Sequence, residues 1–164
     1  MTDLIFVLQL IHVVSGVGWL GEVATVNFVL MPALVRTKGD GRRAILDSIF
    51  PLVFQLATIL GGSAILSGLG LVLWYTQLRP SLLFERPRGW LILVAGTLGV
   101  LLYVFHLLQE SGAERTFATR LAAATGEPAV EAQLLRRLVI FPRLSLIVLT
   151  LVVGLMIAAA HYPF

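Results

Sequence analysis

Four apolar runs, each long enough to cross a membrane as an α-helix, constrain the fold of this chain more than any other feature. They lie at about residues 4–35, 49–75, 90–109 and 138–161, and a helix that crosses a hydrocarbon core needs about 20 residues. Backbone polar groups find no water at that depth, so a spanning segment must satisfy them internally, as a helix does. The sequence therefore predicts an all-α, four-helix transmembrane bundle, formed by a single integral membrane domain over residues 1–164.

The composition agrees with a membrane protein. Of the 164 residues, 58% are hydrophobic and 13% are charged, against about 25% charged residues in soluble domains. The mean hydropathy is +0.94. The net charge of +3 does not indicate nucleic-acid binding, because the basic residues concentrate between the apolar runs, where they act as topology signals. The absence of cysteine excludes thiolate metal sites, disulfides and thiol catalysis.

The connecting segments predict the orientation of the bundle. The first and third connections together carry eight Lys or Arg residues, whereas the second carries three. The positive-inside rule then places the first and third connections in the cytoplasm and both termini outside. We expect a multi-pass protein of the bacterial inner (plasma) membrane, in contact with the lipid bilayer and able to form homo-oligomers.

The third connection is predicted to be an amphipathic cytoplasmic segment at about residues 113–137. Two stretches rich in Ala, Glu and Arg, Ala113–Ala124 and Ala129–Arg137, are interrupted by Gly126 and Pro128. Both stretches are typical of short helices that lie in the membrane interface.

A short internal repeat suggests how the four helices are related. A pair of arginines followed by Ile-Phe-Pro opens the second and the fourth apolar runs, with the prolines at Pro51 and Pro142. Proline is harmless in the first turn of a helix, where its missing N–H has no partner to lose. The repeat is compatible with two parallel helical hairpins related by an axis along the membrane normal. The alternative is that common helix-start chemistry produces the match.

Glu22 is the most unusual residue in the apolar runs, because no cationic residue lies near it in sequence. A carboxylate at membrane depth costs several kcal/mol unless it is protonated, paired or bound to a metal. A rise of about 1.5 Å per residue places one polar residue from each other run within about 6 Å of it in depth: Gln55, His106 and Arg143. With Asn27 just below, they predict a buried polar network in which Arg143 pairs with Glu22. The alternatives are a merely structural ion pair, or an Arg143 that reaches the inner headgroups.

His12 is the best candidate for a ligand in the outer half of the bundle. It lies seven residues before Trp19 and therefore on the same helix face. Neutral imidazole is the usual axial ligand of heme and also suits copper; the alternative is an interhelical hydrogen bond. His106 is the second candidate, but its estimated depth differs from that of His12 by roughly 15 Å. The two histidines should therefore not share one iron.

The first apolar run resembles the opening of copper-resistance-D-type membrane proteins and of their relatives, which include the HemJ-type protoporphyrinogen oxidases. The residues that carry the resemblance are Ile11-His12-Val13-Val14, Gly18-Trp19-Leu20-Gly21 and Val29-Leu30-Met31-Pro32-Ala33-Leu34. The resemblance implies a helical membrane bundle with a heme b or copper site in which His12 is a ligand. In the third run, His106 stands where a HemJ-type enzyme would be expected to have a lysine, and no apolar run contains lysine. This difference argues against protoporphyrinogen oxidation.

The leading hypothesis is a membrane-embedded b-type heme (or copper) protein in electron transfer, redox chemistry or small-ligand handling. It would be a heme-dependent oxidoreductase if it has enzymatic activity, and it would need a redox partner protein. The residues expected at the cofactor are His12, His106, Trp19 and Arg143, with the two histidines as metal ligands. The alternatives are a proton- or metal-coupled transport protein whose pathway is formed by Glu22, His106 and Arg143, and a structural or assembly subunit of a membrane complex.

Overall fold

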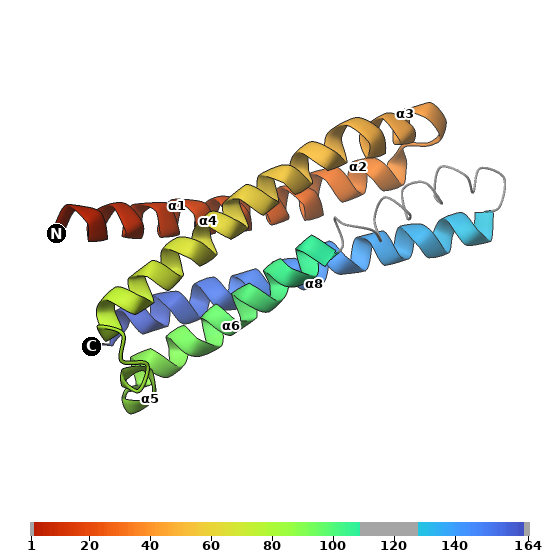
Figure 1. Ribbon diagram of the computed structural model, residues 1–164. Helices are drawn as coiled ribbons and strands as arrows, with labels where there is room; N and C mark the ends of the chain where they lie inside the picture. The colour runs from red at the N-terminus through yellow and green to blue at the C-terminus, as the bar shows by residue number, and fades with distance from the viewer. Residues whose placement is uncertain (1, 109–127, 163–164) are drawn as a thin grey trace.

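A computed structural model of the protein describes residues 2–108 and 128–162, and in these ranges it contains helices and turns but no strand. Four helices are long and apolar enough to cross a membrane: Asp3–Arg36, Gly39–Thr76, Pro87–Leu108 and Val139–His161. They form one elongated bundle with the two ends of the chain on the same side (Figure 1). The predicted all-α bundle with four spanning helices is confirmed.

The first two spanning helices are each built from three consecutive segments. The first comprises α1 (Thr2–Thr25), the π-helical turn η1 (Val26–Leu30) and α2 (Met31–Arg36); the second comprises α3 (Gly39–Ala44), the π-helical turn η2 (Ile45–Ile49) and α4 (Phe50–Thr76). The second helix thus begins at Gly39, not at about residue 49 as predicted. The prediction followed the apolar run, but Asp40, Arg42 and Arg43 continue the helix beyond it. A helix does not have to end where its apolar run ends.

Each π-helical turn ends just before a proline. The N–H of Met31 donates to the carbonyl of Val26 and precedes Pro32. In the same way, the N–H of Phe50 donates to Ile45 and precedes Pro51. A proline ring collides with the carbonyl four residues earlier in a regular α-helix, and a wider turn with hydrogen bonds over five residues relieves this contact. Both helices therefore pass a proline without breaking.

The other two spanning helices are α6 (Pro87–Leu108) and α8 (Pro128–His161), and the short helix α5 (Leu82–Glu85) precedes α6. The predicted separate helix over residues 129–137 is wrong, since α8 is one helix that continues through it. Pro142 accordingly lies inside α8 and not in its first turn. Membrane helices tolerate an internal proline because neighbouring helices and local adjustments satisfy the freed backbone groups. The predicted stretch Ala113–Ala124 lies outside the described residues.

The four long helices associate as two hairpins. Helix α1 packs along α4, and α6 packs along α8, and these contacts are more extensive than those between the hairpins. The hairpins meet at mid-length around a buried cluster from all four helices: Trp19, Val23, Ala57, Leu102 and Leu149. Gly61 and Gly62 of α4 contribute here, because each leaves room for the ring of Tyr103.

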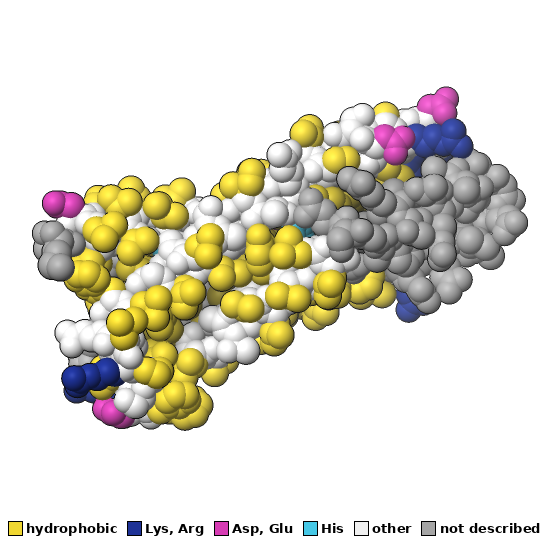
Figure 2. All heavy atoms as spheres, viewed as in Figure 1, with side chains coloured by type: hydrophobic (Ala, Val, Ile, Leu, Met, Phe, Trp, Pro, Cys, Tyr) yellow, Lys and Arg dark blue, Asp and Glu magenta, His cyan; other side chains and the backbone are white. Residues whose placement is uncertain are grey.

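The outer surface suits a lipid environment. Large apolar side chains are exposed along the whole body of the bundle, whereas charged side chains gather at its two ends (Figure 2). A monomeric soluble protein rarely exposes so large a continuous apolar surface. The sides of the bundle are therefore suited to contact with a lipid bilayer.

Candidate functional site

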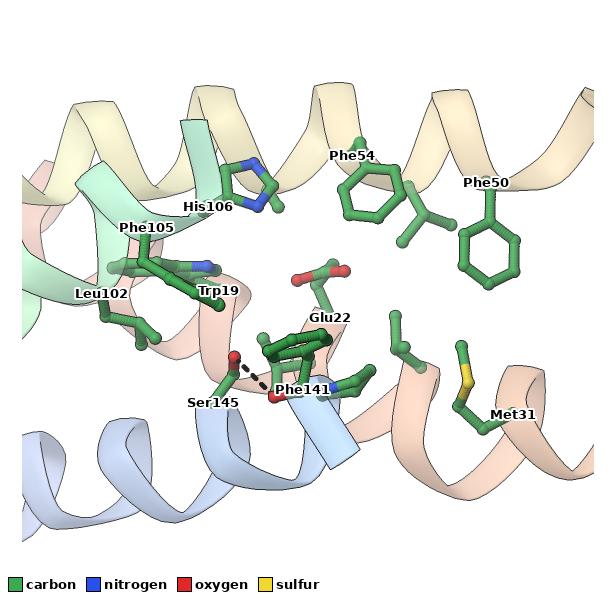
Figure 3. Close-up of a pocket in the computed structure, with 15 residues that line it drawn as sticks. Trp19, Glu22, Met31, Phe50, Phe54, Leu102, Phe105, His106, Phe141 and Ser145 are labelled. Atoms are coloured by element: carbon green, nitrogen blue, oxygen red, sulfur yellow. Dashed lines mark hydrogen bonds between the residues drawn. The ribbon is translucent and has the colours of Figure 1, made fainter. Parts of the chain in front are cut away.

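A small cavity lies between the two hairpins (Figure 3), and we refer to it as the Glu22 cavity. Its volume is about 70 Å³, and all four spanning helices line it. The lining residues are Trp19, Glu22, Val23, Val26, Met31, Phe50, Val53, Phe54, Ala57, Leu102, Phe105, His106, Phe141, Pro142 and Ser145. The π-helical turn η1 contributes Val26 to the lining, and Phe50, the first residue of α4, directly follows η2. Such turns often occur at functional sites.

Glu22 projects from α1 into the middle of this cavity (Figure 3). Its Oε2 atom is buried and has no hydrogen-bond partner within the part of the chain that the structure describes. No Lys or Arg is among the lining residues. An isolated carboxylate in such surroundings costs several kcal/mol, and a buried polar group without a partner calls for an explanation. The described residues therefore provide no positive charge to neutralise the Glu22 carboxyl group.

His106 enters the cavity from α6 and is anchored on α4. Its Nε2 lies 3.0 Å from Oγ1 of Thr58, and the same hydroxyl donates to the carbonyl of Phe54 at 3.0 Å. Both bonds are satisfied when Thr58 accepts the Nε2–H proton of His106. The imidazole also contacts the rings of Phe54 and Tyr103, at centroid distances of 5.6 and 6.4 Å. These contacts hold the ring in one orientation beside the cavity.

Five aromatic side chains line the cavity beside His106: Trp19, Phe50, Phe54, Phe105 and Phe141. Phe50 and Phe54 of α4 lie 5.8 Å apart between ring centroids, and Phe105 of α6 lies 5.6 Å from Phe141 of α8. Trp19 packs edge-on against Tyr103 with a centroid distance of 6.1 Å. The carboxyl group of Glu22 thus lies among aromatic and aliphatic side chains (Figure 3).

His12 belongs to a different part of the bundle. Its Nδ1 lies 2.8 Å from the carbonyl oxygen of Ala64, and Gly68 provides the space for its ring. Because a carbonyl only accepts, Nδ1 carries the proton, and Nε2 is left with the lone pair. The contact points of His12 and His106 on α4, Ala64 and Thr58, are six residues apart, or about 9 Å along the helix. Two imidazoles held at these levels do not converge on one metal.

The predicted polar network forms only in part. Asn27 takes part, since its side-chain amide donates to the carbonyls of Val23 and Pro142, both at 2.8 Å, and so joins α1 to α8. The predictions for Gln55 and Arg143 are wrong, because both side chains are exposed on the outside of the bundle. Each directly follows a residue that lines the cavity, Phe54 or Pro142, and one step along a helix turns a side chain by about 100°. Arg143 therefore does not neutralise Glu22.

The sequence analysis missed several residues of the site: Phe54, Thr58, Tyr103, Phe105 and Phe141. Their spacing carried a usable signal, because they continue helix faces with a period of three or four residues. One such face is Phe50, Phe54 and Thr58, and another is Leu102, Phe105 and His106. An aromatic helix face is equally typical of a surface that contacts lipid, so the sequence does not distinguish a cavity wall from a lipid-facing surface.

The described residues fit a single imidazole ligand better than a complete metal centre. In these ranges, no group of three or more His, Cys, Asp or Glu residues could hold a metal ion. The cavity beside His106, at about 70 Å³, is far below the roughly 300–1,000 Å³ of pockets for drug-sized ligands, so a porphyrin does not fit there. His12 alone has the arrangement of a ligating imidazole, with Nδ1–H fixed by a backbone carbonyl.

Comparison with known proteins adds no relative: no family model, no curated protein and no solved structure matches the chain. The resemblance of the first helix to copper-resistance-D-type proteins stays a prediction.

Proposed function

We propose that this protein is a proton-coupled transport protein of the bacterial inner membrane in which Glu22 is the proton-binding group. One observation carries the proposal: Oε2 of Glu22 is buried in a cavity between two helical hairpins and has no hydrogen-bond partner among the described residues. Acidic residues inside membrane spans are rare, and they typically mark ion pathways and proton relays. A purely structural carboxyl group would be expected to have a hydrogen-bond partner.

His106 is the natural second group of such a relay. It lines the same cavity, and imidazole exchanges protons near neutral pH more readily than any other unperturbed side chain. Thr58 of α4 orients the imidazole of His106 on α6. A change in the protonation of this imidazole would therefore alter the contact between α4 and α6. The weaker packing between the hairpins allows them to shift against each other, as alternating access requires.

Infrared difference spectroscopy of the purified protein tests the proton-binding role directly. We expect spectra recorded between acidic and alkaline buffer to show the carbonyl stretch of a protonated carboxyl group, and Glu22→Gln should remove this band. Glu85→Gln is the matched control, because Glu85 is exposed and lies in α5, in the connection between α4 and α6. A spectrum of Glu22→Gln identical to that of the wild-type protein would refute the proposal.

A second function is favoured by the hydrogen bond from His12 to Ala64. It orients the imidazole in the way that protein ligands to heme iron or copper are oriented, and such a protein would transfer electrons to a redox partner. Only His12 would supply an axial nitrogen, with Trp19 on the same face of α1. The absorption spectrum of the purified protein tests this, with His12→Ala expected to remove the heme bands and His161→Ala to retain them. A colourless, metal-free wild-type protein would rule it out.

A further inference from the structure

We propose that the Glu22 cavity binds a small alkylammonium ion, with the Glu22 carboxylate as its counter-charge. This rests on the proposed function and names its cargo: the cation enters as the proton leaves Glu22, so one positive charge replaces another. The exchange is balanced, since the carboxyl group loses H⁺ and the resulting carboxylate pairs with one monovalent cation.

The wall of the cavity favours an organic cation over a metal ion. Hard metal ions take six or more oxygen ligands, whereas Glu22 is the only acidic residue among the described residues that line the cavity. Aromatic rings attract cations placed over their faces within about 6 Å, and such rings are the usual recognition element for alkylated ammonium groups. Phe54 and Phe141 stand on opposite sides of the Glu22 carboxyl group (Figure 3). Carboxylate and rings together match a cation with an apolar surface.

The size of the cavity limits the ligand. A buried water needs about 10–15 Å³ of such space. At about 70 Å³, the cavity offers about five to seven times that space, which suits a compact cation. Tetramethylammonium has one nitrogen and four carbons, and tetraethylammonium has four more carbons. We therefore expect the smaller cation to bind more tightly.

The charges around the cavity leave Glu22 as the binding group. Among the described residues, His106 and Tyr103 of α6 are the titratable groups packed near it. His106 is held by Thr58, and the hydroxyl of Tyr103 donates to the carbonyl of Thr58 at 3.1 Å. Helix α4 brings no charged side chain to the cavity, and Arg143 of α8 is exposed. The bound cation and the proton therefore compete for one carboxyl group.

Isothermal titration calorimetry of the full-length protein in detergent is the test, with tetramethylammonium and tetraethylammonium chloride as probes. We expect saturable binding of tetramethylammonium, the release of one proton per cation in weakly buffered solution, and binding that tightens as the pH rises. Glu22→Gln should abolish both the binding of tetramethylammonium and the release of the proton. Phe54→Leu, which keeps an apolar side chain but removes the ring, should weaken binding by about tenfold. Phe84→Ala is the control, because Phe84 is exposed and outside the cavity.

Three results would overturn this inference: no saturable binding by wild-type protein, equal binding by Glu22→Gln, or equal binding of the larger cation. In each case, an intact Glu22 band in the infrared difference spectrum would leave the proton-binding role standing. Loss of that band would remove both proposals. If Glu22→Gln does not fold, as judged by circular dichroism, Phe54→Leu decides alone: an unchanged affinity contradicts the aromatic site.

Discussion

Gly68 provides the space in which the imidazole of His12 lies. A Cβ atom at position 68 would stand 2.7 Å from Cε1 and 3.0 Å from Nδ1 of His12. The neighbouring carbonyl of Ala64 accepts the Nδ1–H bond at 2.8 Å. The glycine and the hydrogen bond together fix the height and the orientation of His12 against α4.

We predict that Gly68→Ala displaces His12 and destabilises the protein by about 1–3 kcal/mol, the usual cost of overfilling a packed site. The ring is rigid and cannot give way without losing its bond to Ala64. Equilibrium unfolding in mixed micelles measures the change. Gly16→Ala is the control, because a Cβ there meets nothing within 4 Å, so this change should be neutral or slightly stabilising. Equal stability of the two variants would contradict the close packing of His12 on Gly68.

Asn27 is predicted to hold the two hairpins together. Asn27→Leu removes the hydrogen bonds to Val23 and Pro142, and interhelical hydrogen bonds in membrane proteins contribute about 0.6 kcal/mol on average and up to about 1.7. We therefore expect a loss of about 1 kcal/mol in the free energy of unfolding. Thr25→Val should have a smaller effect, since Thr25 is exposed and bonds only to Gly21 in its own helix. A larger effect from Thr25→Val would contradict this role of Asn27.

Glu22 and Arg143 are predicted to be energetically independent, in contrast to the ion pair expected from the sequence. Arg143 is exposed, so a double-mutant cycle of Glu22→Gln and Arg143→Leu should be additive to within about 0.5 kcal/mol. The measurement is unfolding of the two single variants and the double variant under one condition. A coupling energy of several kcal/mol would mean that the two side chains do interact.

The orientation in the membrane can be measured with single cysteines, because the chain has none of its own. The positive-inside rule predicts that a cysteine at Ser81, in the second connection, reacts from outside with a membrane-impermeant maleimide. A cysteine at Asp40, in the first turn of α3, should react only after the membrane is opened. Both positions are exposed, so a difference in labelling would not result from a difference in burial. The reverse labelling pattern would invert the topology.

The sequence by itself determined the membrane class and the number of spanning helices, and it singled out Glu22 as a buried carboxyl group. These follow from quantities that add up along the chain: the length of an apolar run fixes whether it can span a bilayer, and the cost of burying a carboxylate does not depend on fold. The sequence placed the helix ends less well. Polar residues after Gly39 and before Val139 continue helices that the apolar runs alone do not mark.

The tertiary structure alone decided which polar side chains meet. The rise per residue gave the approximate depth of Gln55 and Arg143, but not the angle at which each leaves its helix, and both turn outward. That angle depends on local geometry: residues 26–30 and 45–49 form π-helical turns, which shift the phase of everything beyond them. It also depends on long-range packing, since His12 and His106 are held by contacts 52 and 48 residues away in sequence. No periodicity within one segment encodes such pairings, because they exist only when α1 and α6 lie against α4.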